Sequence, residues 1–395
     1  MAATTLGFGL AGLGRMGATV APAFNDHPGV RLVAGADLSQ PLVDRLSSDF
    51  GATGYTSFEA LCADRAVDVV CICTPTHLHT EHVLTAVAHG KHVLVAKPMA
   101  LTLADSDRLI AAAERAGVQL VEAHPQTLEP PVLKMRELVR GGELGPLRMV
   151  HTWYFNDWLY RPRLPEELDT ALGGGVTFRQ GAHQFDILRL LGGGRVRSVR
   201  AATGVWDPSR PTEGSHTAFL DFEDGVVATA VYNGYDHFHT SEITFGIGEG
   251  GGPTEPREYA QARLATRSAT AEGEAALKGR FGYGGARAER GRGERRQPFY
   301  GLTVVSCERG DVRQSPDGLL VYADERQQNL ALPMQPTGRD TMIEYVRQAV
   351  LTGQPALHHG RWAKATLEVS LAVLQSARER REITLAHQVP VVGTV

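Results

Sequence analysis

The sequence predicts an α/β protein: a doubly wound parallel sheet in the N-terminal part of the chain, then an α+β domain in the C-terminal part. A glycine-rich turn, Gly12-Leu13-Gly14-Arg15-Met16-Gly17, directly follows the apolar run Leu6 to Leu10. Apolar strands then alternate with amphipathic helices through the first half, which is typical of parallel sheets. The second half holds segments in which apolar and polar residues alternate, which favours antiparallel strands with one covered face.

The glycine turn lies between the first predicted strand and a helix, where dinucleotides bind in this fold class. Gly12 permits a tight turn, Gly14 lets the backbone approach a pyrophosphate, and Gly17 lets helix and strand pack closely. The free N–H groups at the helix N-terminus then face the phosphates. We therefore predict a Rossmann-type cofactor site made of Gly12, Leu13, Gly14, Arg15, Met16 and Gly17. The alternative is a glycine turn in an unrelated α/β protein, and the strands and the acid around it favour the cofactor site.

Asp37 is the acid that completes this pattern. It ends the second predicted strand, residues 30–36, and stands 20 positions after Gly17. A carboxylate there can accept hydrogen bonds from both hydroxyls of the adenosine ribose, and it would repel a 2′-phosphate. The sequence therefore favours NAD over NADP.

The remaining N-terminal elements carry further candidates for the cofactor site. A strand over 67–73 ends at Thr74-Pro75, and ligands bind at the carboxyl ends of such strands, so Thr74, Pro75, His77 and His79 should lie near the cofactor. The other elements expected here are helices over 41–50 and 79–88, a short helix starting within 56–61, and a strand over 92–95.

Lys97 follows that last strand, in Ala96-Lys97-Pro98. At this position a lysine can contact the cofactor, hydrogen-bond a reacting hydroxyl and stabilise negative charge on its oxygen. An ordinary surface lysine is the alternative.

Composition favours a soluble enzyme. The chain has 395 residues, 43% of them hydrophobic, which is enough for two domains with sizeable cores. A formal net charge of −4 gives no electrostatic reason to expect nucleic acid or a membrane surface as a partner. Four cysteines are too few for a disulfide framework, and neither an N-terminal signal nor an apolar stretch of bilayer length is evident, so we expect a cytoplasmic protein. His77, His79 and His82 lack carboxylate or thiolate company, so we expect no metal.

The second half begins where prolines interrupt the repeating pattern, near residues 121–131. We therefore predict a cofactor domain over 1–125 and a substrate-binding and oligomerisation domain over 126–395. An insertion covers about 248–298, with a possible helix over 257–281 and a basic later part, which we read as a solvated loop or an arm over a neighbouring subunit. Predicted strands are 147–155, 196–205, 216–222 and 226–233, and predicted helices are 132–140, 340–351 and 361–381.

A second catalytic candidate lies behind Gly173-Gly174-Gly175. Arg179 and His183 are four residues apart, so a helix would place them on one face, with Asp186 a turn further along. Histidine has a pKa suited to proton transfer near neutral pH. A satisfied buried imidazole is the alternative for a histidine considered alone.

Three stretches resemble the glucose–fructose oxidoreductase / inositol dehydrogenase / MocA family: Gly12 to Gly17, Cys73 to His79, and Gly90 to Pro98. The resemblance implies an NAD-binding domain followed by an open, mostly antiparallel sheet whose outer face mediates oligomer contacts, so we expect a dimer or tetramer. It also implies that Lys97 and His183 surround the substrate. The family's Lys-Pro motif normally begins with Glu where this chain has Ala96, and many members have Asp where this chain has Arg179.

Residues 155–170, 306–313 and 316–319 narrow the resemblance to the phthalate cis-dihydrodiol dehydrogenase branch. Arg179 offers a planar donor pair suited to a substrate carboxylate. Arg161 and Arg163 stand among aromatic residues, a combination that suits a flat anionic molecule, although either alone could be a solvated side chain. Predicted substrate-binding residues are therefore Arg179, Arg161, Arg163, Tyr160 and Trp158.

These observations lead to one hypothesis and two alternatives. The hypothesis is NAD-dependent oxidation of the 4,5- or 3,4-cis-dihydrodiol of phthalate to the dihydroxy aromatic acid, with His183 as base and Lys97 as electrostatic partner, or the reverse. One alternative is a dehydrogenase of a sugar, inositol or sugar acid. The other is a catalytically silent NAD-binding regulator.

Overall fold

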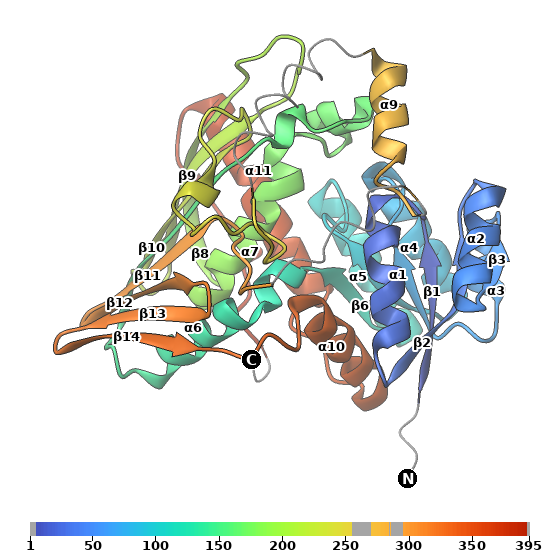
Figure 1. The fold of residues 1–395 in the computed structure, drawn as a ribbon, viewed down its shortest axis with the longest axis horizontal. Coiled ribbons are helices and arrows are strands. Elements are labelled where there is room, and N and C mark those ends of the chain that lie inside the picture. Colours follow the sequence, from blue (N-terminus) through green and yellow to red (C-terminus); the bar gives the residue numbers. More distant parts are fainter. Residues whose placement is uncertain (1–4, 255–269, 284, 286–294, 393–395) are drawn as a thin grey trace. The chain divides into compact units, whose positions relative to one another are not determined.

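The computed structural model describes residues 5–254, 270–283, 285 and 295–392, and these divide into two compact units (Figure 1). The described residues of unit 1 are 5–124, 275–283, 285 and 339–364. Those of unit 2 are 125–254, 270–274, 295–338 and 365–392. Most of the predicted helix over 257–281, and Arg287, Arg290 and Arg292 of its basic continuation, lie outside the described residues. Helix α9 (Ala271–Gly279) is the described part of that prediction.

Unit 1 is built on a six-stranded parallel sheet in the order β3-β2-β1-β4-β5-β6. This confirms the predicted doubly wound sheet. The order reverses between β1 and β4, so the carboxyl ends of these two strands flank the crevice in which such sheets bind ligands. The strands are β1 (Leu6–Ala11), β2 (Val30–Ala36), β3 (Thr53–Tyr55), β4 (Val69–Ile72), β5 (His92–Ala96) and β6 (Leu120–Ala123).

Helices cover both faces of this sheet (Figure 1). Helix α5 shows why the sequence folds this way locally: Thr102 accepts a hydrogen bond from the N–H of Asp105 at its start, and Gly117 ends it in the left-handed conformation with φ of 67°. Between these caps, Leu109 and Ala113 are buried. The helices of this unit are α1 (Arg15–Asp26), α2 (Gln40–Phe50), α3 (Phe58–Ala63), α4 (His79–Ala88), α5 (Leu103–Ala116) and nearly all of α10 (Gly338–Thr352).

Unit 2 contains a nine-stranded sheet in the order β14-β13-β12-β11-β7-β10-β9-β8-β15. Every neighbouring pair is antiparallel except β7 and β10, which run parallel. The prediction of a mostly antiparallel sheet is thereby confirmed. The strands are β7 (Leu147–Phe155), β8 (Val196–Gly204), β9 (Ser215–Phe222), β10 (Val227–Asn233), β11 (Leu302–Cys307), β12 (Gly310–Ser315), β13 (Gly318–Ala323), β14 (Arg326–Ala331) and β15 (Ile383–Thr384).

One face of the second sheet is covered and the other is open, as the alternating sequence predicts. Helix α7 (Ala182–Leu191) packs against β7 and β10, and Val150 and Tyr154 of β7 are buried on that side. Met149 and Trp153 alternate with them and are 41% and 44% exposed. Helices α6 (Pro130–Gly141) and α11 (Gly360–Glu379) also contribute described residues to this unit.

The predicted regular helix through Arg179 is wrong in one respect. Residues Thr177–Gly181 form a π-helical turn, η6, and the α-helix α7 begins only at Ala182. The helix through Arg179 therefore changes from π to α geometry just before His183. Asp186 is fully buried and accepts a hydrogen bond from Thr127 Oγ1 at 2.5 Å.

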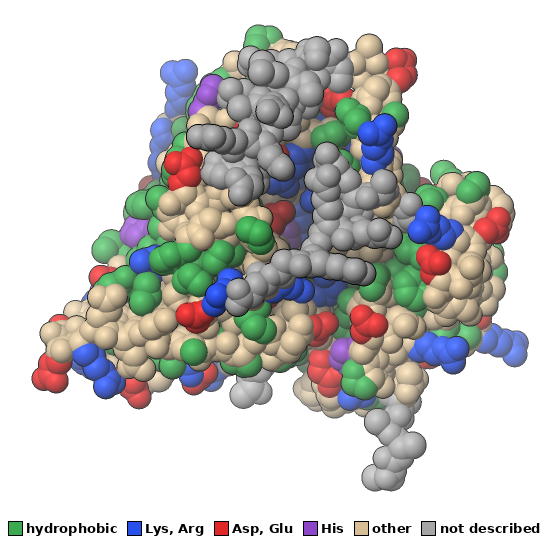
Figure 2. Space-filling model, in the orientation of Figure 1, with side chains coloured by type: hydrophobic (Ala, Val, Ile, Leu, Met, Phe, Trp, Pro, Cys, Tyr) green, Lys and Arg blue, Asp and Glu red, His purple; other side chains and the backbone are tan. Residues whose placement is uncertain are grey.

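The described surface carries charges of both signs. Acidic and basic side chains are interspersed on the face drawn in Figure 2. Within the described ranges, no helix combines the length and the apolar character needed to cross a membrane.

Candidate active site

The glycine turn of unit 1 has the geometry that a dinucleotide site requires. Gly12 has φ of +89°, and a Cβ on it would lie 2.9 Å from the carbonyl carbon of Cys73, the residue after the neighbouring strand β4. A Cβ on Gly17 would lie 2.3 Å from Gly12 O, so helix α1 could not pack this closely with a larger residue. A Cβ on Gly14 would meet no atom within 4 Å. The backbone at Gly14 is therefore open to a phosphate, at the N-terminus of α1.

Asp37 is tied to this turn. Its Oδ2 accepts a hydrogen bond from Leu13 N at 2.7 Å, and its Oδ1 accepts one from Ser39 N at 2.9 Å. A carboxylate has about four acceptor positions, so both oxygens can still accept hydroxyl groups. The turn and the acid together fit a bound dinucleotide.

Part of the insertion contacts the same turn. Tyr283 donates its backbone N–H to Leu13 O at 3.1 Å and its hydroxyl to Asp49 Oδ2 at 2.6 Å. The guanidinium of Arg15 lies 5.9 Å from the centre of the Phe281 ring. The sequence offered no signal for these contacts, because no spacing rule joins residues so far apart in the chain.

The loop after β4 divides into exposed and internal residues. Pro75 and His77 are exposed, whereas Thr74 Oγ1 hydrogen-bonds His82 Nδ1 at 2.8 Å. His79 is buried, and its two ring nitrogens lie 2.8 Å from Pro98 O and 3.0 Å from Thr74 O. It thus joins this loop to the residue after Lys97. Among the described residues, no group of three or more metal-binding side chains is arranged to hold a metal ion.

Lys97 is half-buried at the end of β5, and the residues after it are held from β6. Glu122 Oε1 accepts a hydrogen bond from Met99 N at 2.5 Å, and its Oε2 lies 2.6 Å from His124 Nε2. Both side chains are buried. A carboxylate therefore does support the turn at Lys97, but it comes from the neighbouring strand and not from position 96. Sequence reasoning missed Glu122.

His183 lies near the start of α7 in unit 2, against Tyr300. The two rings meet edge to face with centres 5.1 Å apart. Tyr300 donates its hydroxyl to Gln180 Oε1 at 2.7 Å and to Gln180 O at 2.9 Å. Burial, reinforced by Tyr232 and Glu249, raises the pKa of Tyr300 well above its usual value. The tyrosine beside His183 is therefore a protonated donor at neutral pH.

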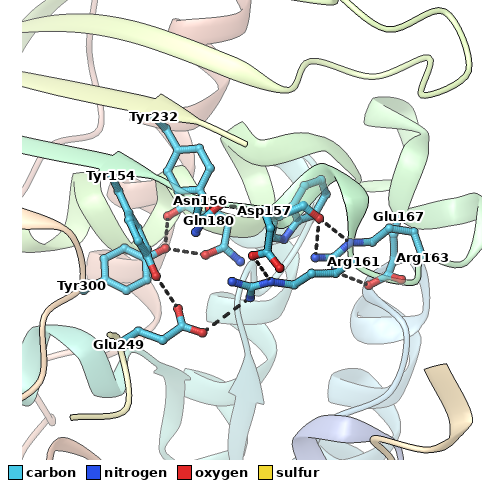
Figure 3. Close-up of polar contacts among 11 residues, drawn as sticks. Tyr154, Asn156, Asp157, Arg161, Arg163, Glu167, Gln180, Tyr232, Glu249 and Tyr300 are labelled. Atoms are coloured by element: carbon cyan, nitrogen blue, oxygen red, sulfur yellow. Dashed lines mark hydrogen bonds and ion pairs between the residues drawn. The ribbon is translucent and has the colours of Figure 1, made fainter. Parts of the chain in front are cut away.

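Two more tyrosines join this cluster (Figure 3). Tyr154 and Tyr232 are partners in the parallel register of β7 and β10. Their ring centres are 5.4 Å apart, and Tyr154 lies 4.9 Å from Tyr300. Tyr232 donates its hydroxyl to Asn156 Oδ1 at 2.8 Å. The cluster thus places hydroxyl and amide groups next to flat apolar rings in the interior of this unit.

Arg161 lies at the edge of this cluster between two acids (Figure 3). Its Nε donates to Asp157 Oδ1 at 2.7 Å, and its Nη1 is 3.6 Å from Glu249 Oε1. Tyr154 donates its hydroxyl to Glu249 Oε2 at 3.1 Å. Burial by itself would lower the pKa of the guanidinium, but Asp157 and Glu249 raise it well above its usual value. Arg161 therefore carries a permanent positive charge.

Arg163 and Arg179 share a different acid, Glu167. Arg179 Nη2 is 2.6 Å from Glu167 Oε1, and Arg163 Nη1 is 3.5 Å from the same oxygen. Arg163 is buried, with its guanidinium 4.0 Å from the centre of the Trp158 ring and bonded to Trp158 O.

Trp158 and Tyr160 are also internal. Both are almost completely buried, and Tyr160 donates its hydroxyl to Asp207 Oδ2 at 2.8 Å. The structure thus brings the predicted substrate residues into one unit and surrounds them with protein groups. The sequence did not single out these acids and amides as site residues: Asn156, Asp157, Glu167, Gln180 and Glu249.

Two family models match the chain. Residues 6–124 match the oxidoreductase family with an NAD-binding Rossmann fold, and residues 132–250 match the GFO/IDH/MocA C-terminal domain.

Individual relatives agree with the models. A 1-carboxy-3-chloro-3,4-dihydroxycyclohexa-1,5-diene dehydrogenase of Comamonas testosteroni is 36% identical over 376 residues, 94% of each chain. A crystal structure of a candidate dehydrogenase from Bordetella bronchiseptica RB50 has a TM-score of 0.91 and 38% identity, covering 97% of this chain and all of that one. A myo-inositol 2-dehydrogenase of Thermotoga maritima is 29% identical over 199 residues, 50% of this chain and 58% of its own.

Proposed function

Because the chain belongs to the GFO/IDH/MocA family of oxidoreductases, we propose that it oxidises a carboxylated ring cis-dihydrodiol to the dihydroxy aromatic acid with NAD as oxidant. That it is an oxidoreductase acting on CH–OH groups follows from its family and relatives. The choice of substrate rests on one observation: the Comamonas testosteroni relative, which matches 94% of this chain, is named for a carboxylated dihydroxycyclohexadiene.

The proposed cofactor site is the glycine turn with Asp37. The open backbone at Gly14 and the N-terminus of α1 would hold the pyrophosphate, and Asp37 would accept the ribose hydroxyls. The preference for NAD over NADP is part of the proposal, because a 2′-phosphate would bring like charges together at Asp37.

The chemistry needs a hydride and a proton to leave the same carbinol. When bound, the nicotinamide accepts the hydride. His183 is the proposed base for the hydroxyl proton, since an imidazole suits proton transfer near neutral pH and its ring lies edge to face with the ring of Tyr300. Lys97 is the proposed residue that stabilises negative charge on the reacting oxygen. The hydroxyketone that forms loses a ring proton and gains one on oxygen, giving a catechol, and aromatisation draws the reaction forward.

A dehydrogenase of neutral polyols is the second candidate, and one observation favours it. Each arginine proposed to hold a substrate carboxylate already contacts a carboxylate of the protein: Asp157 and Glu249 for Arg161, and Glu167 for Arg163 and Arg179. A site in which the positive charge is already compensated also suits hydroxyl groups. The myo-inositol 2-dehydrogenase relative is consistent with such a substrate.

A substrate panel separates the candidates. Purified protein is mixed with NAD and, in turn, the 4,5- and 3,4-cis-dihydrodiols of phthalate, the cis-dihydrodiol of benzoate, inositol and glucuronate, and NADH absorbance is followed. Turnover of a dihydrodiol alone supports the proposal. Turnover of inositol alone replaces it with the neutral-polyol hypothesis, and turnover of glucuronate alone replaces it with a sugar-acid dehydrogenase. Binding of NADH without turnover of any substrate points to an NAD-binding regulator.

We also propose that the chain forms a homo-oligomer through the open face of the second sheet. Met149 and Trp153 of β7 and Phe219 of β9 all lie on strands of this sheet and are 41–44% exposed. An apolar face of this kind is costly to leave in water and is typical of subunit contacts.

A further inference from the structure

The two carboxylates that contact Arg161, those of Asp157 and Glu249, differ in contact distance and in exposure to solvent. Asp157 is four residues before Arg161, contacts Nε at 2.7 Å, and its side chain is 10% exposed. Glu249 is 3.6 Å from Nη1, and its side chain is 33% exposed. Asp157 thus orients the guanidinium from inside, while Glu249 approaches it from the solvent side in a looser contact.

Glu249 is carried on a turn whose backbone is held from outside: Phe299 N donates to Gly248 O at 3.1 Å, and Arg296 N donates to Gly251 O at 2.8 Å. The turn is closed by a hydrogen bond from Gly248 N to Gly252 O at 3.0 Å, and Ile247 pairs with Pro253 across its base. Glycines flank Glu249 on both sides, at Gly248 and Gly250. Because this backbone is held, the carboxylate leaves Arg161 by rotation of the glutamate side chain, which is 33% exposed, while the turn stays in place.

We propose that Glu249 occupies the binding position of a substrate carboxylate and is exchanged for it on binding. The incoming carboxylate would take the hydroxyl of Tyr154 and the Nη1 side of Arg161, while Asp157 keeps the Nε side. This proposal rests on the proposed function, and it deepens it by naming the subsite for the acid group: Arg161 with Tyr154.

The exchange also determines how many carboxylates the substrate ring can carry. One carboxylate replaces one carboxylate, so the charge around Arg161 is the same before and after binding. A second ring carboxylate would need another cation. The two other arginines predicted to bind substrate, Arg163 and Arg179, both contact Glu167, whose side chain is 6% exposed. The site therefore favours a ring diol with one carboxylate over one with two.

Binding of product-like catechols tests this without relying on turnover. Dissociation constants are measured by titration calorimetry in saturating NAD for catechol, 3,4-dihydroxybenzoate and 4,5-dihydroxyphthalate, which carry none, one and two carboxylates. We expect the monoacid to bind most tightly. Glu249→Gln should lower the dissociation constant of the monoacid about three- to tenfold, because the competing charge is gone, and it should leave the dissociation constant of catechol unchanged.

Two variants complete the test. Arg161→Lys keeps a cation beside Asp157 but loses the forked donor group. It should therefore weaken the binding of the monoacid about tenfold and leave the binding of catechol unchanged. Glu242→Gln removes an exposed carboxylate on the neighbouring short helix η7 (Thr240–Glu242) and should alter neither ligand.

Several results would overturn the proposal. One is that Glu249→Gln binds the monoacid as tightly as the wild type does, or more weakly; another is that its affinity for catechol changes by the same factor. The others are that the diacid binds more tightly than the monoacid, and that the monoacid binds neither the wild type nor Glu249→Gln. If Glu249 instead bound the substrate hydroxyls, Glu249→Gln would also weaken the binding of catechol. If a carboxylated dihydrodiol is oxidised but Glu249→Gln behaves like the wild type, the proposed function stands and this inference fails. If the panel shows no dihydrodiol turnover, selective tightening of the monoacid still supports the subsite.

Discussion

Replacing Glu122 tests how the turn at Lys97 is held. In Glu122→Ala the N–H of Met99 and Nε2 of His124 lose partners at 2.5 Å and 2.6 Å. Both acceptor contacts are internal, since Glu122 is 2% and His124 0% exposed. A buried polar group left without a partner costs about 1–3 kcal/mol, so we expect a loss of roughly 2–6 kcal/mol in the free energy of unfolding.

We expect the substitution at Glu122 to lower the rate of turnover without changing the affinity for the cofactor. Met99 is two residues after Lys97, so loosening it displaces the lysine, whereas the glycine turn is built on β1 and keeps its contacts. In Glu122→Gln the amide oxygen can still accept from Met99 N, so we expect a stability loss of only about 1 kcal/mol. The substrate-saturated rate should fall in both variants, further in Glu122→Ala, with the affinity for NAD unchanged.

The assay combines urea unfolding, NADH binding by fluorescence, and turnover on whichever substrate the panel identifies. Glu114→Ala is the matched control, because Glu114 is an exposed acid whose ion pair with Arg361 lies at the surface, and such pairs contribute about 0–1 kcal/mol. Our reasoning fails if Glu122→Ala unfolds at the same urea concentration as Glu114→Ala. It also fails in its functional part if stability falls while turnover does not.

Three further predictions concern other parts of the molecule. Asp37→Ser should lower kcat/KM with NAD by about ten- to 100-fold, and it should reduce the ratio of kcat/KM with NAD to kcat/KM with NADP. An unchanged ratio would contradict the placement of Asp37 at the ribose. Burial lowers the pKa of His216 to about 3, so its neutral form stabilises the fold above pH 6.5, and this stability is lost as the pH falls from 6.5 toward 3, at no more than about 1.4 kcal/mol per pH unit. His216→Gln should therefore flatten the acid side of the stability curve, and a parallel curve would contradict the assignment. Trp153→Ser should reduce the mass measured by light scattering if the open sheet face joins subunits, and an unchanged mass would place the contact elsewhere.

Local rules predicted much of the N-terminal half. The span Val30–Ala36 coincides with β2 and His79–Ala88 with α4, because apolar periodicity and glycine punctuation act over a few residues. The role of Gly12 could be read from sequence for the same reason: a positive φ of +89° at a tight turn admits few other residues. The π turn at Thr177–Gly181 could not, since its one extra residue per turn leaves no mark in an apolar pattern.

The partners of the predicted site residues were beyond such rules. Tyr154 and Glu249 are 95 positions apart, and Tyr300 and Gln180 are 120 apart. Contacts of this kind depend on how strands and loops are placed in three dimensions, and a single sequence carries no periodic signal for them. The residue types at such positions, tyrosine and glutamate, are also common on ordinary surfaces.

The arginines show why counting charged residues overstates an anion site. A guanidinium removed from water is costly unless an anion accompanies it, so a largely buried arginine that awaits an acidic ligand must be paired with a protein carboxylate in the meantime. The informative question is then which of those carboxylates can leave. Side-chain exposures of 10% for Asp157, 6% for Glu167 and 33% for Glu249 single out the last. The three arginines that a sequence presents as equal candidates thus differ physically: among these ion pairs between described residues, the pair of Arg161 with Glu249 holds the most exposed of the acids.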